Sequence, residues 1–324
     1  MRSDWKEELY RLSAARAATT VWLISDVQRT DMDEMKYRLD LAGRDVRSLD
    51  LHPDKIIHLG DAVQGRDDPA RLRAMAKEQA AWLDTFGTPV LFVLGNHDLD
   101  LTEAPDGKAV PAAFFRDEVL KRPAWQTTEK ISDACFRAEV GGFVLYCFSD
   151  CMAEDGAWRA RFGEVQGETE KCPYNEDFYA ALRERIAAEE RPVITVSHYA
   201  YVGGARPSAR MSKLMPLPAN VRLHFHGHAH IGALDVCYES AFRRLGWVDW
   251  HDVPEINVSS LSGEEDGSCI RSVILHLYED GTAGIFFRDH SKGQFEECFF
   301  PSPENRAEGL SAYLSTHPGF RWYK

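Results

Sequence analysis

Residues 90–98 read VLFVLGNHD, an apolar run that ends in a glycine followed by three polar side chains. A turn sequence, GTP at residues 87–89, precedes this run and separates it from a helical pattern. A short apolar run between turn residues predicts a buried β-strand. The polar residues that follow, Asn96, His97 and Asp98, can bind a metal ion or transfer a proton.

Four further apolar runs end in residues of the same kind. Because ligands of open α/β sheets bind beyond the carboxyl ends of the strands, we expect these ends to meet at one crevice. The runs and their ends are 21–24 with Ser25, Asp26 and Gln28; 55–59 with Gly60 and Asp61; 192–197 with His198; and 221–226 with Gly227, His228 and His230.

Helical patterns connect the first three runs. Apolar residues recur at three- and four-residue spacing from Met35 to Leu49 and from Leu72 to Phe86, which is typical of amphipathic helices. Strand, helix and strand at this spacing predict right-handed βαβ units with parallel strands.

The second half of the chain adds antiparallel character. Residues 143–148 predict a strand, and the spacing of apolar residues over 178–186 predicts a helix with Asn175 as its N-cap. Alternation over 273–277, a turn signal at 279–281 and an apolar run at 284–287 predict a hairpin. We therefore expect two mixed sheets packed face to face, with helices outside.

The charge balance is acidic, with 38 Lys and Arg against 51 Asp and Glu in 324 residues, a net charge of −13. This excess repels phosphate backbones and anionic lipids at long range, so we expect neither a general nucleic-acid binder nor a membrane-surface protein. A small phosphorylated substrate remains compatible with this charge, because divalent cations can reverse the field inside one cleft.

Compartment and domain organisation follow from simpler signals. The first residues lack the apolar core of a secretory signal, no run approaches the length of a membrane span, and the seven cysteines include no CxxC pair. We therefore expect a cytoplasmic protein. We predict a single domain over residues 1–300, with insertions at about 99–135 and 150–174, and a C-terminal extension at 301–324.

Asp, Asn and His side chains together form a ligand set that suits Mn²⁺, Fe, Zn²⁺ or Co²⁺. One central carboxylate can bridge two ions about 3.5–4 Å apart, and such a pair holds the attacking and leaving oxygens of a displacement at phosphorus. A water between the ions ionises near neutral pH and attacks as hydroxide, so no protein nucleophile is needed.

The blocks D-x-Q, GD, GNHD, H and GHAH, in this order between residues 26 and 230, resemble the calcineurin-like metallophosphoesterase superfamily. The resemblance implies a four-layer αββα sandwich of two mixed β-sheets and a centre of two divalent metal ions. It implies metal-binding roles for Asp26 and His230 at the first ion, Asp61 as the bridge, and Asn96, His198 and His228 at the second ion.

The same resemblance implies two catalytic roles. His97 would stabilise the charge that develops on the phosphate and protonate the leaving oxygen. Asp98 would orient His97 through a hydrogen bond to the far ring nitrogen.

Gln28 stands where most members of the superfamily have histidine. Its amide oxygen is a harder and weaker ligand than imidazole, so we expect the first site to favour Mn²⁺ or Mg²⁺ over Zn²⁺. The D-x-Q block is similar to the manganese-dependent ADP-ribose/CDP-alcohol diphosphatase branch, whose members hydrolyse nucleoside-diphosphate compounds.

The sequence thus predicts an enzyme that hydrolyses a small phosphodiester or nucleoside-diphosphate substrate. The alternatives are a phosphomonoesterase or nuclease of the same fold, and a catalytically silent metal-binding scaffold. Arg29, Arg66 and Arg206 are candidates for phosphate contacts, although a solvated surface position is the commoner setting for each. His58, His224 and His226 lie inside predicted strands and are interpreted as structural.

Overall fold

The computed structural model describes residues 5–64, 68–95, 97–98, 129–132, 135–148, 176–198, 214, 217–228, 230, 255–262 and 270–300. Its strands form two mixed sheets of six strands each. The first sheet has the order β12 (Gln294–Phe299), β11 (Ala283–Asp289), β10 (Arg271–Leu277), β1 (Thr19–Ile24), β2 (Lys55–His58), β3 (Val90–Phe92). The second has the order β4 (Glu129–Ser132), β5 (Cys135–Val140), β6 (Phe143–Phe148), β7 (Val193–Ser197), β8 (Val221–His226), β9 (Glu255–Asn257).

The predicted βαβ units are present in the first sheet. Strands β1, β2 and β3 pair in parallel, and helices α2 (Met32–Ser48) and α3 (Pro69–Asp84) connect them. Each helix begins at an aspartate whose carboxylate accepts free backbone N–H groups, Asp31 for α2 and Asp68 for α3. The predicted hairpin is also present, since β10 and β11 pair antiparallel.

Strand β1 shows how one run of sequence supports both faces of its sheet. Val21 and Leu23 point into the core between the two sheets, whereas Trp22 and Ile24 pack with residues of the outer helices such as Met35. All four β1 side chains are fully buried. Burial of each stabilises the fold by about 1.5–3 kcal/mol, which explains the continuous apolar pattern of the strand.

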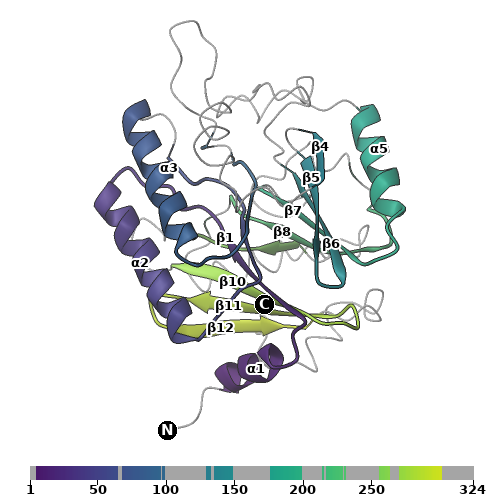
Figure 1. Cartoon of the computed structure of the whole chain (residues 1–324), viewed down its shortest axis with the longest axis horizontal. Coiled ribbons are helices and arrows are strands. Elements are labelled where there is room, and N and C mark those ends of the chain that lie inside the picture. The colour runs from purple at the N-terminus through teal and green to yellow at the C-terminus, as the bar shows by residue number, and fades with distance from the viewer. Residues whose placement is uncertain are drawn as a thin grey trace, which may run out of the picture.

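The molecule has four layers. Figure 1 shows α2 and α3 on one side, α5 (Glu176–Ala187) on the opposite side, and the two sheets between them. The strand order and the shared core between the sheets confirm the predicted αββα sandwich. Within the described part of the chain, none of the helices has the length and apolar character that a membrane crossing requires.

Several elements were not predicted. They are α1 (Trp5–Ala14), β4, β5, β9 and β12. Strand β12 reads QFEECF. Its Glu296 is buried in an ion pair with Arg271 of β10. A charged residue at a buried position interrupts the apolar pattern that would have indicated a strand. Strand β4 lies inside the stretch that was predicted to be an insertion, and the domain boundaries stay a prediction. Asn175, the predicted N-cap of α5, lies outside the described residues.

Candidate metal centre

The polar residues of the strand ends meet where the carboxyl ends of β1, β2, β7 and β8 come together. Backbone hydrogen bonds join the loops: the amides of Val27 and Gln28 donate to the carbonyl of Asp61 at 2.9 and 3.0 Å. In the second sheet, the amide of Gly227 donates to the carbonyl of His198 at 3.1 Å. The loops therefore form one connected scaffold rather than independent turns.

Four side chains at this edge sit on a left-handed backbone. The φ angles of Asp26, Asp61, His228 and His230 are 52°, 54°, 67° and 45°. This region costs non-glycine residues free energy, of the order of 1 kcal/mol or more each, and it persists only where the surroundings impose it. Strain concentrated at one edge marks that edge as the functional part of the molecule.

Two glycines are required by close approach of the loops. A Cβ atom on Gly95 would collide with the carboxylate of Asp61, and one on Gly227 would collide with Ser25 and the carboxylate of Asp26. These glycines therefore let the two carboxylates lie against the neighbouring loop.

The carboxylates of Asp26 and Asp61 are held in the same way. One oxygen of each accepts a backbone N–H: Asp26 Oδ2 from His228 at 3.0 Å, and Asp61 Oδ1 from His97 at 2.7 Å. The other oxygen of each, Asp26 Oδ1 and Asp61 Oδ2, is buried and accepts no hydrogen bond. A buried carboxylate oxygen without a donor is costly unless a cation is its partner.

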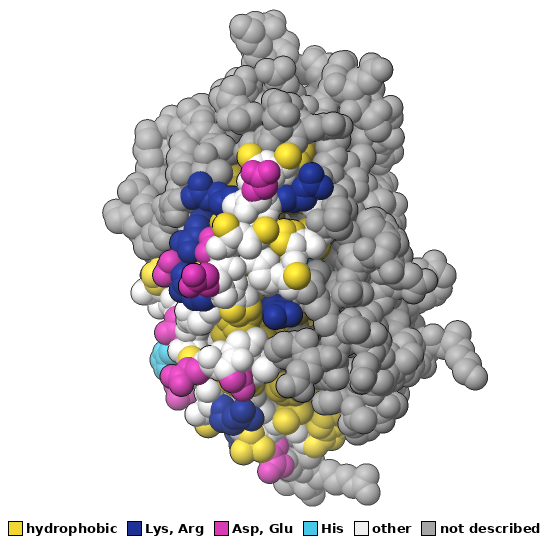
Figure 2. Space-filling model, turned by 90° about the vertical axis from the view of Figure 1, so that its right-hand side faces the viewer, with side chains coloured by type: hydrophobic (Ala, Val, Ile, Leu, Met, Phe, Trp, Pro, Cys, Tyr) yellow, Lys and Arg dark blue, Asp and Glu magenta, His cyan; other side chains and the backbone are white. Residues whose placement is uncertain are grey.

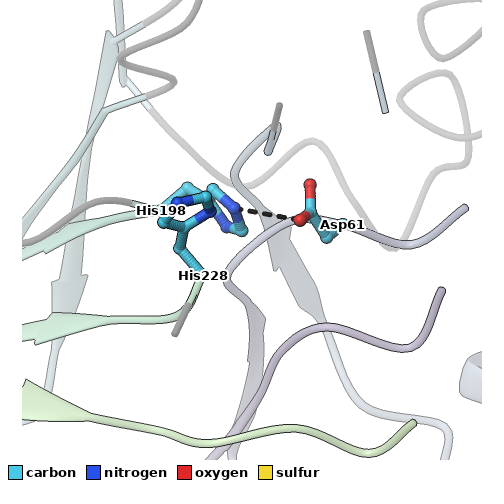
Figure 3. Close-up of side chains that lie close together, drawn as sticks. All are labelled: Asp61, His198 and His228. Atoms are coloured by element: carbon cyan, nitrogen blue, oxygen red, sulfur yellow. Dashed lines mark ion pairs between the residues drawn. The ribbon is translucent and has the colours of Figure 1, made fainter. Parts of the chain in front are cut away.

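Histidine nitrogens face these two oxygens. His230 Nε2 lies 2.9 Å from Asp26 Oδ1, and His198 Nε2 lies 3.2 Å from Asp61 Oδ2. Asp61, His198 and His228 point toward one another (Figure 3), and their ligand atoms lie within 4.8 Å of each other. Asp26, Asp61 and His230 form a second group of the same size. Asp61 belongs to both groups, as a bridging carboxylate must.

The protonation states of Asp26, Asp61 and His228 suit metal binding. Burial acts to raise the pKa of Asp26 and of Asp61, but the nearby histidines hold both below their ordinary value. Burial lowers the pKa of His228 to about 3, and His198 acts in the same direction. Burial would lower the pKa of His230, but the charge of Asp26 raises it. Two ionised carboxylates and a neutral His228 are the forms that bind a cation.

The His198 ring has a defined orientation. Its Nδ1 lies 2.8 Å from the backbone oxygen of Leu59, and only an N–H at this position can make that hydrogen bond. The lone pair is then on Nε2, which faces Asp61. A carbonyl that fixes the tautomer in this way is a typical outer partner of a metal-binding histidine.

Gln28, a predicted ligand of the first ion, lies beside His230. The side chain is buried, and its Nε2 lies 2.8 Å from His230 Nε2. Its Oε1 is buried and accepts no hydrogen bond. A half-turn of the amide exchanges the two atoms, so Gln28 can present an oxygen to the ion that His230 and Asp26 would hold.

The predicted pairing of Asp98 with the His97 ring is wrong. His97 Nδ1 lies 2.6 Å from the backbone oxygen of Gln64, which takes the place predicted for Asp98. The Asp98 carboxylate is fully buried and accepts backbone N–H groups of Gly95, Asp61, Ala62 and Val63 instead. Backbone donors engage both Asp98 oxygens, and nothing in the sequence indicates such donors.

Burial, followed by the charge of Asp61, raises the pKa of Asp98 to about 8, while the N–H groups of Gly95 and Ala62 act in the opposite direction. Both Asp98 oxygens serve as acceptors for two N–H groups each. Each of these N–H groups favours the ionised form, because a hydrogen bond donated to a carboxylate stabilises its charge.

The other predicted residues fall into three groups. Arg29 donates to the backbone oxygen of Ser262 and lies 3.9 Å from Glu34, so its guanidinium is engaged with the protein. Three predicted residues lie outside the described part of the chain: Asn96, Arg66 and Arg206. The strand histidines His58, His224 and His226 are buried, in keeping with the structural interpretation.

A segment that the sequence gave no reason to select supports the centre from the side. Strand β9 is followed by residues 258–262, which pass along the Asp26 loop. The amides of Leu261 and Ser262 donate to the carbonyls of Ser25 and Asp26 at 3.0 and 2.9 Å. At the start of the segment, Asn257 Nδ2 donates to the carbonyl of Gly227 at 2.8 Å. This support segment therefore ties the Asp26 loop to the His228 loop.

The described residues fit a pair of divalent ions. Asp26 Oδ1 and Asp61 Oδ2 are buried without a donor, imidazole nitrogens face both oxygens, and Asp61 belongs to both ligand groups. The sequence profile of the calcineurin-like phosphoesterases matches residues 19–232. The chain belongs to the calcineurin-like phosphoesterase family. It is therefore a metal-dependent hydrolase of phosphoric esters, and a dinuclear centre of divalent ions is the arrangement that the family and the geometry imply.

One solved structure supports the fold of this phosphoesterase. A dimetal phosphatase from zebrafish (Danio rerio) aligns with a TM-score of 0.60 at 13% identity, over 88% of this chain and 99% of that one. A purple acid phosphatase from yellow lupin (Lupinus luteus) seeds aligns with a TM-score of 0.48 at 13% identity, over 87% of this chain and 53% of that one. Among curated protein sequences, none matches this phosphoesterase significantly.

Proposed function

We propose that this phosphoesterase hydrolyses a small phosphodiester or a nucleoside-diphosphate compound at the edge where the strand ends meet. The observation that carries the proposal is the pair of buried oxygens, Asp26 Oδ1 and Asp61 Oδ2, which have no hydrogen-bond donor and face imidazole nitrogens. The proposed ligands of the first ion are Asp26, Gln28 and His230, with Asp61 shared, and those of the second are Asn96, His198 and His228.

Two divalent ions held by these residues would activate a water and withdraw charge from the phosphate oxygens. The protein's part is to hold these groups still and to manage the proton. Asp61 Oδ1 accepts the His97 amide N–H, which fixes the backbone of His97 beside the bridge. The ring donates Nδ1–H to the Gln64 carbonyl, which orients the ring, and we assign Nε2 to stabilise the phosphate and to protonate the leaving oxygen.

The proposed substrate class is a nucleoside diphosphate of the ADP-ribose or CDP-alcohol kind. Gln28 supports this class, because its glutamine resembles the D-x-Q block of the corresponding diphosphatase branch. A neutral amide ligand also favours Mn²⁺ or Mg²⁺ at the first site over Zn²⁺. We therefore propose Mn²⁺ as the preferred metal.

A nuclease is the weaker candidate. The net charge of −13 opposes the approach of a long polyanion. On the described part of the face in Figure 2, Lys and Arg side chains lie beside Asp and Glu side chains rather than in one continuous basic area. A small phosphorylated substrate needs no such area.

A panel of substrates tests the proposal directly. The metal-stripped protein is supplied with Mn²⁺ and compared on ADP-ribose, a CDP-alcohol, a cyclic nucleotide, an aryl phosphodiester and an aryl phosphomonoester. We expect hydrolysis of the diphosphates or the diester in preference to the monoester. Preference for the monoester contradicts the proposed substrate class. Inactivity on every compound while both ions are bound supports the alternative of a catalytically silent metal-binding scaffold.

His97→Ala tests the proposed catalytic role. We expect turnover to fall by about 10²–10⁴-fold with the metal content unchanged, because the variant loses a proton donor and no ligand. His52→Ala is the matched control, since the His52 side chain is 85% exposed and hydrogen-bonds only to Asp50 on the described surface. Full turnover by His97→Ala on every substrate contradicts the assignment.

A further inference from the structure

The Asp98 carboxylate accepts four backbone hydrogen bonds beside the proposed metal centre. Oδ2 accepts the amides of Asp61 and Gly95, both at 2.8 Å. Oδ1 accepts the amides of Ala62 and Val63 at 2.6 and 3.3 Å. The carboxylate is fully buried, so no water competes for these donors.

Three of the four donors are consecutive amides that begin at Asp61. Successive N–H groups that converge on one anion form a concave nest, which is an ordinary way to hold a negative charge. Here the anion belongs to the protein, and the loop that contains Asp26 and Gln28 binds the same turn through a different group, the Asp61 carbonyl. This carbonyl accepts the amides of Val27 and Gln28 at 2.9 and 3.0 Å.

The Asp61 turn is thus fixed by two sets of hydrogen bonds. Its left-handed φ of 54° needs such support, because the conformation is unfavourable for aspartate. Its side chain is the carboxylate shared by both candidate ligand groups. A small rotation of this turn would move the shared oxygen relative to both groups at once.

Resting on the proposed function, we infer that Asp98 is a positioning residue for the metal centre rather than for the His97 ring. Its ionised carboxylate fixes the Asp61 turn and the Gly95 loop through four N–H hydrogen bonds, and thereby sets the affinity for the ions. The ring of His97 is oriented separately, by the carbonyl of Gln64.

Asp98→Asn tests this inference with a side chain of the same shape. An amide presents an NH₂ group where the carboxylate presents an acceptor, so two of the N–H donors lose their partner. We expect Mn²⁺ affinity, measured by calorimetric titration of the metal-stripped protein, to fall by about 10–100-fold, the usual effect of losing a group that orients ligands. Excess Mn²⁺ restores turnover to within about tenfold of wild type.

Two further variants separate an effect on the metal centre from a general loss of stability. Asp289→Asn is the matched control, because Asp289 is also buried and accepts backbone amides, those of Ser291 and Lys292, at 2.9 and 3.3 Å. We expect it to lower the thermal midpoint and leave Mn²⁺ affinity unchanged. Asp98→Glu keeps the charge on a longer side chain, so we expect an affinity between those of Asp98→Asn and wild type, which provides the measurement if Asp98→Asn does not fold.

The inference is overturned if Asp98→Asn or Asp98→Glu binds Mn²⁺ as tightly as wild type while turnover falls as in His97→Ala and excess metal does not restore it. That result would make Asp98 a partner of the His97 ring. Failure of the proposed function looks different, because a wild-type protein that binds no Mn²⁺ in the same titration contradicts the metal centre itself.

Discussion

Two buried clusters in the described part of the molecule place an aspartate beside a histidine. They differ in whether all the oxygens of the aspartates accept hydrogen bonds. In the metal centre, Asp26 Oδ1 and Asp61 Oδ2 accept no hydrogen bond. In the second cluster, both oxygens of Asp45 are occupied: Arg288 donates to them at 2.7 and 2.8 Å, and His290 Nδ1 lies 2.8 Å away.

The second cluster, here called the Asp45 cluster, continues from His290 to Ser272 and Trp22. His290 Nε2 lies 2.7 Å from Ser272 Oγ, which also accepts the indole N–H of Trp22 at 2.7 Å. The order Asp, His, Ser resembles a nucleophilic triad, but Ser272 is fully buried and its hydroxyl is shared with Trp22. Completed hydrogen bonds inside the core identify a structural network, whereas incomplete ones at strand ends identify a site for a cation.

The largest expected effect is a loss of turnover when the proposed bridging carboxylate, Asp61, is replaced. Asp61→Asn removes a charge that both ions share, so we expect turnover to fall by at least about 10³-fold, equivalent to roughly 4 kcal/mol of transition-state stabilisation. The metal-free variant should unfold below the wild-type temperature, because the histidines that lower the pKa of Asp61 lose the carboxylate that they stabilise in the fold. Steady-state kinetics and thermal unfolding in the presence of a chelator measure the two effects.

Asp45→Asn is expected to produce the opposite pattern. The variant leaves the Arg288 guanidinium buried without its ionic partner, so the free energy of unfolding should decrease by about 3 kcal/mol. Turnover at saturating metal should stay at the wild-type level. Urea unfolding and kinetics check both statements, and a loss of turnover without a loss of stability would remove the distinction between the two clusters.

The pH dependence of stability sharpens the same comparison. Burial acts to raise the pKa of Asp45, but Arg288 and His290 lower it to about 2. A carboxyl with a lowered folded-state pKa stabilises the protein above its unfolded pKa, and this stabilisation is lost as the pH falls through the folded pKa. The stability advantage of wild type over Asp45→Asn should therefore shrink between about pH 4 and about pH 2, and an advantage that stays constant would contradict the ion pair.

The smallest expected effect lies at the end of the Asp45 cluster. Trp22→Phe removes the indole N–H from Ser272 and leaves a small cavity beside Trp82 and Phe86, whose rings lie 5.7 and 5.1 Å away. We expect a loss of about 1–2 kcal/mol in unfolding free energy and unchanged Mn²⁺ affinity. A weaker Mn²⁺ affinity would mean that the cluster reaches the metal centre through β1.

The sequence predicted the strands that are buried on both faces and the helices that are apolar on one face. In β1 and β2 both faces are buried, so residues 21–24 and 56–57 are apolar without interruption, and the helix between the two strands has one apolar face. Strand β5 reads CFRAEV, and its Arg137 pairs with Glu189 across the sheet surface. Strands whose exposed or buried positions carry ion pairs lose the apolar signal and were missed.

The candidate ligands were predictable because ordered motifs carry them, and the structure brings Asp26, Asp61 and the histidines to one edge. The partners of Asp98 were not, because a backbone N–H has no sequence signature. The same holds for the support segment. Asn257 and Ser262 make backbone contacts that only the pairing of β8 with β9 creates, and a serine-rich stretch alone indicates a loop.

The central claim is that Asp61 is shared by two divalent ions. Calorimetric titration of the metal-stripped wild-type protein with Mn²⁺, followed by electron paramagnetic resonance of the loaded protein, tests it most directly. The claim predicts two ions per chain and a signal from magnetically coupled Mn²⁺, with both lost in Asp61→Asn and retained in Asp45→Asn. A single uncoupled ion in the wild-type protein, or two ions in Asp61→Asn, would contradict it.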